Sequence, residues 1–360
     1  MKKLVILSVV ILSLAFAMCG DEYGSEQNDV FDRSSVLIGI AMPENYVRWP
    51  RDGEEIKNAA LALGYKAVLV NADGSQDTQN AQIKSLIDEG AKLIIVANID
   101  SGINPAITEA KKAGVIIIAY DRLIQGTGDY NYYITFNNYE VGQMQGRAII
   151  DALDLTTQKN IVLFAGSPAD KNADFFFSGA MDVLQQYINS EKLNVLGGTS
   201  LSEVGIPGWS LNNADSRINA LFDGTTPIHA ILAPNDSCAR YIIGKYEEKY
   251  SSGPFPLVTG QDAEFDSAMF IKNGKQLMTV FKNTSALAAN AVKLADQLLE
   301  QKTVSIPGTV LAAGKLAEMG DTGVKKVTTF LMEPALINKD NLGDLIGIGW
   351  FTQEQEDQLE

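Results

Sequence analysis

The sequence predicts an α/β fold made of two doubly wound, parallel-sheet lobes. One indication is the apolar run Val115–Ala119, which follows Gly114 and lacks period-2 alternation, as strands buried on both faces of a parallel sheet do. Runs of this kind alternate with helical patterns, as in βαβ units with right-handed crossovers. The length of 360 residues is too great for one ordinary core and favours two domains.

The first lobe follows from strand and helix patterns between residues 36 and 136. Strands are expected at Val36–Ala41, Tyr65–Val70, Leu93–Val96, directly after Gly114, and at Tyr132–Phe136. Helices are expected from Pro50 to Gly64, over Asp77–Glu89 and over Pro105–Ala113. A glycine follows each helical pattern as a stop signal, and proline stands near the start of two of them.

The same order of elements begins again after Asn137-Asn138. Strands are expected at Ile161–Phe164, around Val195, and at Ala230–Leu232, Leu257–Thr259 and Leu277–Phe281. Helices are expected through Met181 and Leu184, and over Ala214–Phe222, Ser237–Glu248, Ala263–Lys272 and Ser285–Glu300. The single histidine, His229, lies in an apolar run, which favours a strand residue with a local partner over a catalytic base.

Residues 1–18 have the pattern of a segment that is removed during processing and are not expected to be part of the fold. Lys2 and Lys3 precede an apolar stretch that ends at Met18, so residues 1–18 are expected to be a signal peptide and residues 19–35 a polar tether. Cleavage after Ala17 and lipidation of Cys19 both fit the sequence, and the lone Cys19 favours lipidation. The protein is therefore expected to be exported, to the periplasm or to the outer face of the cell membrane, with a lipid anchor at Cys19. Cys238 is then the only other cysteine, so the mature chain can form no internal disulfide.

The charge and the motif content exclude several functions. A net charge of −15 without a cluster of Lys and Arg argues against nucleic acid as a partner. Neither G-x-G-x-x-G nor G-x-x-x-x-G-K-[ST] is present, and one His with one remaining Cys cannot build a zinc site. A loop at Asn338–Gly349 fails as a calcium site because Leu342 and Gly349 occupy ligand positions. We therefore expect no cofactor, no metal and no enzyme activity.

Polar side chains follow the ends of the predicted strands in both halves of the chain. These residues are Arg48, Asp121, Asp170, Asn235, Asp262 and Lys282. Ligands bind outside the carboxyl ends of parallel strands, so two crevices facing each other are expected, with the ligand between two lobes. Asp121 and Arg122 could grip a polyhydroxylated molecule, or they could form a surface salt bridge. Trp209, which follows Pro207-Gly208, could stack on a sugar ring or cap a core.

Four motifs then resemble one family. They are Ile38–Pro43 with Arg48-Trp49, Ala119–Ile124, Gly166-Ser167-Pro168 through Asn172-Ala173, and Gly260-Gln261-Asp262-Ala263. The chain resembles, from Val36 to its C-terminus, the periplasmic sugar-binding proteins of ABC importers, in the xylose-binding and multiple-sugar-binding branch of the ribose/galactose type. One departure is Asp170-Lys171-Asn172, where the family commonly has Asp-Asn-Asn. If Lys171 pointed inward, the cleft could prefer acidic sugars.

The resemblance implies a type I binding protein with two lobes and three hinge segments. The lobes would comprise residues 36–136 plus 282–328 and residues 137–281 plus 329–360, with hinges near Phe136–Asn138, Val280–Lys282 and Thr328–Met332. The sugar contacts it implies are Arg48, Trp49, Asp121, Arg122, Asp170, Asn172, Trp209, Asn235, Asp262 and Lys282. The ligand would be an aldose such as xylose, glucose or galactose, and a monomer would deliver it to a membrane permease. The alternative is delivery of the closed form to a chemoreceptor or sensor kinase.

Overall fold

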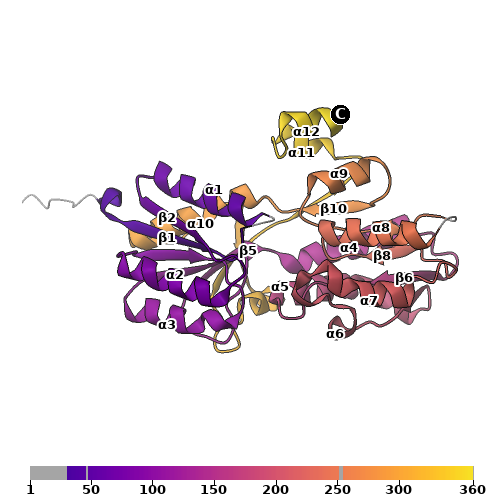
Figure 1. Ribbon diagram of the computed structural model, residues 1–360, viewed down its shortest axis with the longest axis horizontal. Coiled ribbons are helices and arrows are strands. Elements are labelled where there is room, and N and C mark those ends of the chain that lie inside the picture. The colour runs from indigo at the N-terminus through magenta and orange to yellow at the C-terminus, as the bar shows by residue number, and fades with distance from the viewer. Residues whose placement is uncertain (1–30, 46–47, 251–253, 360) are drawn as a thin grey trace, which may run out of the picture. The chain divides into compact units, whose positions relative to one another are not determined.

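The computed structural model describes residues 31–45, 48–250 and 254–359. The predicted signal peptide and Cys19 lie outside these residues, as does most of the predicted tether. From Arg33 onward the chain forms one compact unit, which contains one seven-stranded, one four-stranded and one two-stranded sheet (Figure 1).

The first lobe is built on the seven-stranded sheet, in the order β11-β12-β5-β4-β3-β1-β2. The strands are β1 (Leu37–Met42), β2 (Lys66–Asn71), β3 (Leu93–Val96), β4 (Ile116–Tyr120), β5 (Tyr132–Phe136), β11 (Thr309–Leu311) and β12 (Thr328–Met332). All neighbouring strands are parallel except β11 and β12. The helices are α1 (Trp49–Ala62), α2 (Gln76–Asp88), α3 (Asn104–Lys112) and α10 (Thr284–Leu299). Figure 1 shows α2 and α3 on one face of the sheet and α1 with α10 on the other.

Local sequence signals account for these elements. All four residues of β3 are buried, as expected for a strand covered on both faces. Pro50 stands in the first turn of α1, where its missing N–H costs nothing. The Ser75 side chain caps α2 by accepting the Thr78 N–H. Gly114, which follows α3, has φ of +74°, a left-handed conformation that glycine adopts without strain.

The second lobe carries the four-stranded sheet β7-β6-β8-β9 and the antiparallel pair β10-β13. The strands are β6 (Lys159–Leu163), β7 (Leu193–Leu196), β8 (Ala230–Leu232), β9 (Leu257–Val258), β10 (Met278–Phe281) and β13 (Ala335–Asn338). The helices are α4 (Asn138–Ala152), α5 (Lys171–Asn189), α6 (Leu201–Val204), α7 (Leu211–Leu221), α8 (Asp236–Lys249), α9 (Phe265–Lys272), α11 (Gly343–Gly347) and α12 (Gln353–Leu359). One core packs α7 and α8 on the four-stranded sheet, and another packs α4 and α5 on it.

The predicted fold class is confirmed, and the strand and helix patterns match observed elements to within a few residues. His229 has the local partner expected of it, because the Asn160 N–H donates to His229 Nδ1 at 3.0 Å. Four helices were not predicted: α4, α6, α11 and α12. Helix α4 nevertheless begins at a capping signal in the sequence, since the Asn137 side chain accepts the Glu140 N–H.

The chain crosses between the lobes at three places. The first two crossings lead from β5 into α4 and from β10 into α10, and each ends at an asparagine cap, Asn137 or Asn283. The predicted third hinge, Thr328–Met332, is misplaced because these residues pair with β5 along the whole of β12. The chain therefore leaves the first lobe after Met332, between β12 and β13, rather than at residue 328.

Helices α4 and α5 approach closely through glycines. A Cβ atom added to Gly142 would lie 1.8 Å from the Phe176 carbonyl oxygen, and one added to Gly179 would lie 2.0 Å from the Tyr139 carbonyl oxygen. Since both obstacles are backbone atoms, neither contact can be relieved by a side-chain movement.

We expect Gly142→Ala to lower the free energy of unfolding by about 1–3 kcal/mol, because the two helices must separate to admit the methyl group. Urea denaturation measures this change. The control is Gly244→Ala on α8, where an added Cβ meets nothing within 4 Å. That change should stabilise the protein by up to ~1 kcal/mol through helix propensity. Equal effects of the two substitutions would contradict the close packing of α4 on α5.

The C-terminal segment, residues 339–359, packs on the second lobe. Leu345 and Leu359 are buried in a core with Phe281 of β10. Trp350 lies edge-on to Phe281 with ring centroids 4.7 Å apart, and Phe351 packs similarly on Phe265 of α9 at 5.6 Å. Trp350 and Phe351 therefore lie next to the end of β10 and the start of α9, respectively.

Candidate functional site

A cavity of about 370 Å³ lies where polar residues of both lobes meet. All ten residues named from the sequence line it: Arg48, Trp49, Asp121, Arg122, Asp170, Asn172, Trp209, Asn235, Asp262 and Lys282. The volume is within the usual range for small-molecule sites. The structure therefore brings together in one cavity the strand-end residues that the sequence placed in two facing crevices.

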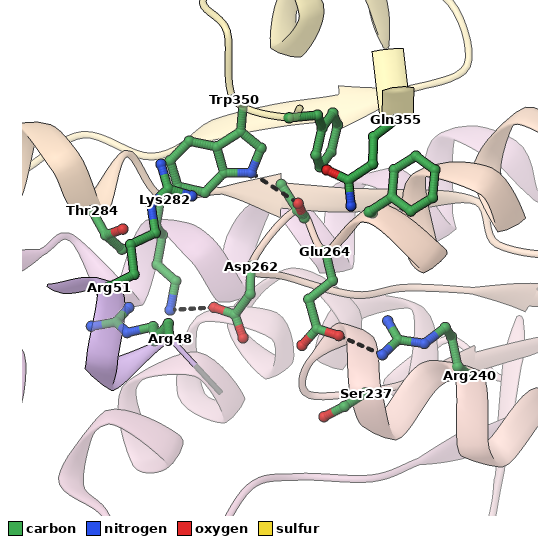
Figure 2. A pocket seen from close by; sticks show the side chains of 13 residues that line it. Arg48, Arg51, Ser237, Arg240, Asp262, Glu264, Lys282, Thr284, Trp350 and Gln355 are labelled. Atoms are coloured by element: carbon green, nitrogen blue, oxygen red, sulfur yellow. Dashed lines mark hydrogen bonds and ion pairs between the residues drawn. The ribbon is translucent and has the colours of Figure 1, made fainter. Parts of the chain in front are cut away.

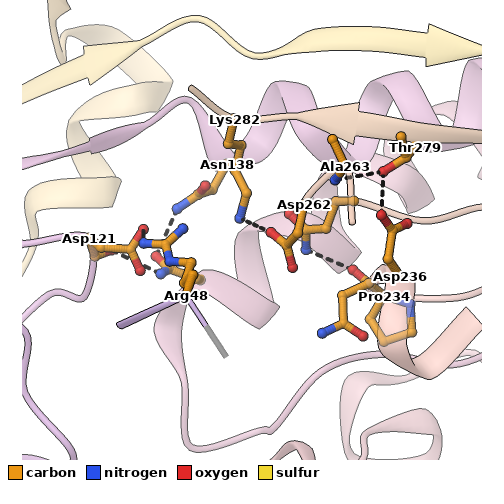
Figure 3. A network of polar contacts seen from close by, with 12 residues as sticks. Arg48, Asp121, Asn138, Pro234, Asp236, Asp262, Ala263, Thr279 and Lys282 are labelled. Carbon is orange, nitrogen blue, oxygen red and sulfur yellow. Dashed lines mark hydrogen bonds and ion pairs between the residues drawn. The ribbon is translucent and has the colours of Figure 1, made fainter. Parts of the chain in front are cut away.

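Arg48 and Asp121 form the charged centre of the first-lobe side (Figure 3). Arg48 Nη2 lies 2.6 Å from Asp121 Oδ1 and 3.2 Å from Asp52 Oδ2, so one guanidinium serves two carboxylates. Burial lowers the pKa of Arg48, but Asp121 and Asp52 raise it above its ordinary value. Burial raises the pKa of Asp121, yet Arg48, Lys282 and Arg122 together lower it below its ordinary value. Asp121 is therefore held as a carboxylate, an acceptor for hydroxyl hydrogens.

Trp49 stacks with two cations at the same end of the pocket. The Cζ atoms of Arg48 and Arg122 lie 4.8 Å and 4.9 Å from its ring centroid. Cation–π contacts of this kind hold guanidinium groups in fixed orientations. Arg122 also donates to the Asn98 carbonyl oxygen at 3.3 Å. The two arginines are thereby positioned before any ligand enters.

Asp262 and Lys282 form the ion pair of the second-lobe side, with Nζ and Oδ1 2.9 Å apart (Figure 2). The turn that carries Asp262 is organised by the fully buried Asp236. Asp236 accepts hydrogen bonds from the Glu264 N–H at 2.9 Å and from Thr279 Oγ1 at 2.9 Å. Thr279 Oγ1 in turn accepts the Ala263 N–H (Figure 3). The Asp236 side chain beneath the pocket thus fixes the backbone on both sides of Ala263.

Asp170 and Trp209 form the opposite wall of the pocket. Asp170 Oδ1 caps α5 by accepting the Asn172 N–H at 2.9 Å, while Oδ2 accepts the Trp209 indole N–H at 3.2 Å. The six-membered ring of the indole packs closely against Gly166, where an added Cβ would clash with Trp209 Cη2. Trp209 also packs on a small core, and its side chain lines the pocket as well.

Asn172 links the two lobes directly. Its Nδ2 donates to the Asp121 carbonyl oxygen at 3.0 Å, and its Oδ1 accepts from Asn138 Nδ2 at 2.8 Å. The Asp121 carbonyl also accepts from Tyr133 Oη at 2.8 Å and Thr135 Oγ1 at 3.1 Å. Three donors on one oxygen fix the backbone at the end of β4.

Three non-glycine residues of the pocket have left-handed backbone conformations. The φ angles are +61° at Asp121, +58° at Trp209 and +98° at Asp262. Non-glycine residues adopt such angles at a cost of order 1–3 kcal/mol, and they concentrate at ligand sites. The hydrogen bonds around Asp121 and Asp262 are what hold these turns in place.

Six further residues line the pocket and were not named from the sequence: Glu44, Phe176, Gly208, Ser210, Ser237 and Gln261. Gln261 adjoins Asp262 and is buried, donating to the Pro234 carbonyl at 2.7 Å. Phe176 is buried on α5, and its ring lies 5.3 Å from Lys282 Nζ. An apolar helix residue carries no strand-end signal, so Phe176 could not be found by that reasoning.

Lys171, which the sequence left in either of two orientations, does not line this pocket. Its Nζ lies 2.6 Å from Asp174 Oδ2, and it borders an adjoining cavity of about 500 Å³. The ion pair neutralises the one lysine whose inward orientation would have favoured acidic sugars.

The described part of the chain holds no cluster of three or more His, Cys, Asp and Glu side chains suited to bind a metal ion. Among the described residues, no helix combines the length and the apolar character needed to cross a bilayer.

The chain matches the periplasmic binding protein domain over residues 38–303. It belongs to the periplasmic binding protein family. This family consists of substrate-binding proteins of transporters, so the prediction of a binding protein rather than an enzyme is confirmed.

Several relatives of this periplasmic binding protein are similar over most of its length. The multiple sugar-binding periplasmic protein SbpA of Azospirillum brasilense is 38% identical, over 91% of this chain and 93% of its own. The D-xylose-binding periplasmic protein of Escherichia coli K12 is 32% identical, over 89% of this chain and 92% of its own. An ABC transporter solute-binding protein from Clostridium phytofermentans, solved with bound β-D-glucose, superposes with a TM-score of 0.81 at 34% identity, covering 89% of this chain and 99% of its own.

Proposed function

We propose that this periplasmic binding protein captures a neutral aldose, xylose or a glucose-like or galactose-like pyranose, for an ABC importer. The observation that carries the proposal is the convergence of the ten predicted residues, from both lobes, on one cavity of about 370 Å³. Relatives named for multiple sugars and for D-xylose, and a similar structure solved with β-D-glucose, support the ligand class.

Different pocket residues would contact different parts of the sugar. The carboxylates of Asp121 and Asp262 accept hydroxyl hydrogens, while Arg48 and Arg122 donate to ring and hydroxyl oxygens. Trp209 supplies an aromatic face for the C–H face of the pyranose, with Trp49 orienting the arginines. Each cation already faces a carboxylate or a carbonyl oxygen, which suits a neutral ligand.

Binding would stabilise a closed arrangement of the two lobes about the three crossings, and this closed monomer would dock on the membrane permease. No cofactor is required. Export and a lipid anchor at Cys19 belong to the same proposal, because capture for import takes place outside the cytoplasmic membrane.

A thermal-shift panel of pentoses, hexoses and uronic acids tests the ligand class. A specific sugar at about 100 times its Kd should stabilise the protein by ~2.7 kcal/mol and raise the melting temperature. We expect neutral aldoses to produce this shift and uronic acids to produce little. A panel without any shift would refute sugar capture, and a preference for uronic acids would refute the neutral ligand.

The alternative is that the closed form signals to a chemoreceptor or sensor kinase. A relative from Rhizobium radiobacter, 36% identical over 88% of this chain, is named a multiple sugar-binding periplasmic receptor, which favours keeping this role. Sugar-dependent co-purification with a permease subunit or with a receptor would separate the two roles.

A further inference from the structure

A second cavity, of about 540 Å³, adjoins the sugar pocket (Figure 2). The two cavities share four lining residues, Arg48, Ser237, Asp262 and Lys282, so the Lys282–Asp262 ion pair lies on their common boundary. A group attached to a sugar in the first cavity could therefore extend into the second.

The wall far from the sugar pocket is aromatic and comes from two separate stretches of chain. Trp350 and Phe351 belong to the C-terminal segment, and Phe265 begins α9. All three side chains are only partly buried, although Trp350 is fixed by a hydrogen bond from its indole N–H to the Ala263 carbonyl at 3.0 Å. Arg51 covers the ring of Trp350, with its Cζ atom 4.1 Å from the ring centroid, so the rings left to contact an occupant are those of Phe265 and Phe351. Aromatic rings that border a cavity favour a ring as the occupant.

The charges of this cavity are paired within the protein. Arg51 lies 2.9 Å from Glu55, Lys282 lies 2.9 Å from Asp262, and Arg240 pairs with Glu264. Arg48, the remaining cation of the lining, pairs with Asp121. An anionic group would have to displace one of these carboxylates, so a neutral group is favoured.

We propose that the second cavity holds a neutral ring joined to the captured sugar, so that the protein accepts glycosides as well as free aldoses. The inference rests on the proposed function, because the sugar anchors the ligand through the first cavity. The ring could be an aryl group or a second pyranose, since both present a face that can pack against Phe265 and Phe351. Neither needs a charge.

Calorimetry with the aldose that gives the largest thermal shift, and with its methyl, phenyl and 1,4-linked disaccharide glycosides in both anomeric forms, tests the inference. We expect the phenyl glycoside, the disaccharide or both to bind about tenfold more tightly than the methyl glycoside of the same anomer. The methyl glycoside reports the cost of substitution at the anomeric oxygen without filling the second cavity. If the free aldose binds and no ring-bearing glycoside exceeds its methyl counterpart, the inference is wrong and sugar capture stands. If nothing binds, sugar capture itself fails.

Variants of Phe351 locate the ring. Phe351→Ala should abolish the tenfold gain and leave the affinity for the free aldose unchanged, since Phe351 does not line the sugar pocket. Phe351→Leu preserves apolar packing on Phe265 but removes the aromatic face, so it should lose most of the gain even if the alanine variant folds poorly. Phe255→Ala is the matched control, because Phe255 makes a similar edge contact with Tyr246 elsewhere in the second lobe. A gain that survives both Phe351 variants would place the ring elsewhere.

Discussion

Replacing Asp121 with asparagine is expected to weaken sugar binding about 100-fold. The carboxylate that Arg48 holds at 2.6 Å would lose its charge. A hydrogen bond to a charged group contributes ~1.5–3 kcal/mol and one to a neutral group ~0.5–1.5 kcal/mol, so two bonds from sugar hydroxyls would together lose about 2–3 kcal/mol. Asparagine tolerates the φ of +61° at this position, so the backbone should keep its course. Isothermal titration with the preferred aldose measures the effect.

The control for this substitution is Asp129→Asn. Asp129 also accepts two side-chain hydrogen bonds, from Thr108 at 2.6 Å and Lys111 at 2.7 Å, and it lies outside the pocket. The Asp129→Asn protein should bind the aldose with the same affinity as the unaltered protein. An Asp121→Asn protein that binds within about threefold of the unaltered one would show that Asp121 does not contact the sugar.

Replacing Asp236 with alanine is expected to have the largest effect on stability, a loss of roughly 3 kcal/mol in the free energy of unfolding. The substitution removes the acceptor of three donors, the Glu264 N–H, Thr279 Oγ1 and Gln276 Nε2, of which only Gln276 Nε2 keeps another acceptor, the Met278 carbonyl. Urea denaturation measures the loss, and Asp266→Ala, at an exposed position in the first turn of α9, should cost only about 0.5 kcal/mol. Equal losses would contradict the role of Asp236 beneath the pocket.

The difference between the two proteins should also depend on pH. Burial raises the pKa of Asp236 well above 3.8, opposed by the Glu264 N–H. A carboxyl group with a raised folded-state pKa contributes stability below its unfolded pKa and loses it as the pH rises through the folded-state pKa. The loss caused by Asp236→Ala should therefore be larger at pH 4 than at pH 7. If the loss of unfolding free energy caused by Asp236→Ala instead grew with pH, the folded-state pKa of Asp236 would be lowered rather than raised.

Residues at strand ends were the part of the site that could be predicted from sequence. Arg48, Asp121 and Asp262 follow apolar runs whose alternation with helices determines the edge at which they emerge. Gln261 and Phe176 were missed because burial in the pocket wall depends on how the two lobes meet. The left-handed conformations of Asp121 and Asp262 likewise depend on tertiary hydrogen bonds.

The C-terminal part of the fold was the least predictable. Helices α11 and α12 are short, and their apolar residues are too few to show a helical period. The third crossing was misplaced because the sequence of the strand Thr328–Met332 does not indicate which sheet it joins. Only its pairing with β5 in the structure shows that it belongs to the first lobe. Such pairings between distant segments are what local patterns do not encode.

The position of β12 near the end of the sequence has a consequence for the synthesis of the protein. The seven-stranded sheet takes β11 and β12 from residues 309–332, although its other strands lie before residue 137. A nascent chain leaving the ribosome therefore cannot complete its first lobe until nearly the whole polypeptide has emerged. A C-terminal truncation that extends past residue 332 would open the edge of the first sheet, and neither lobe can be produced from one uninterrupted stretch of the gene.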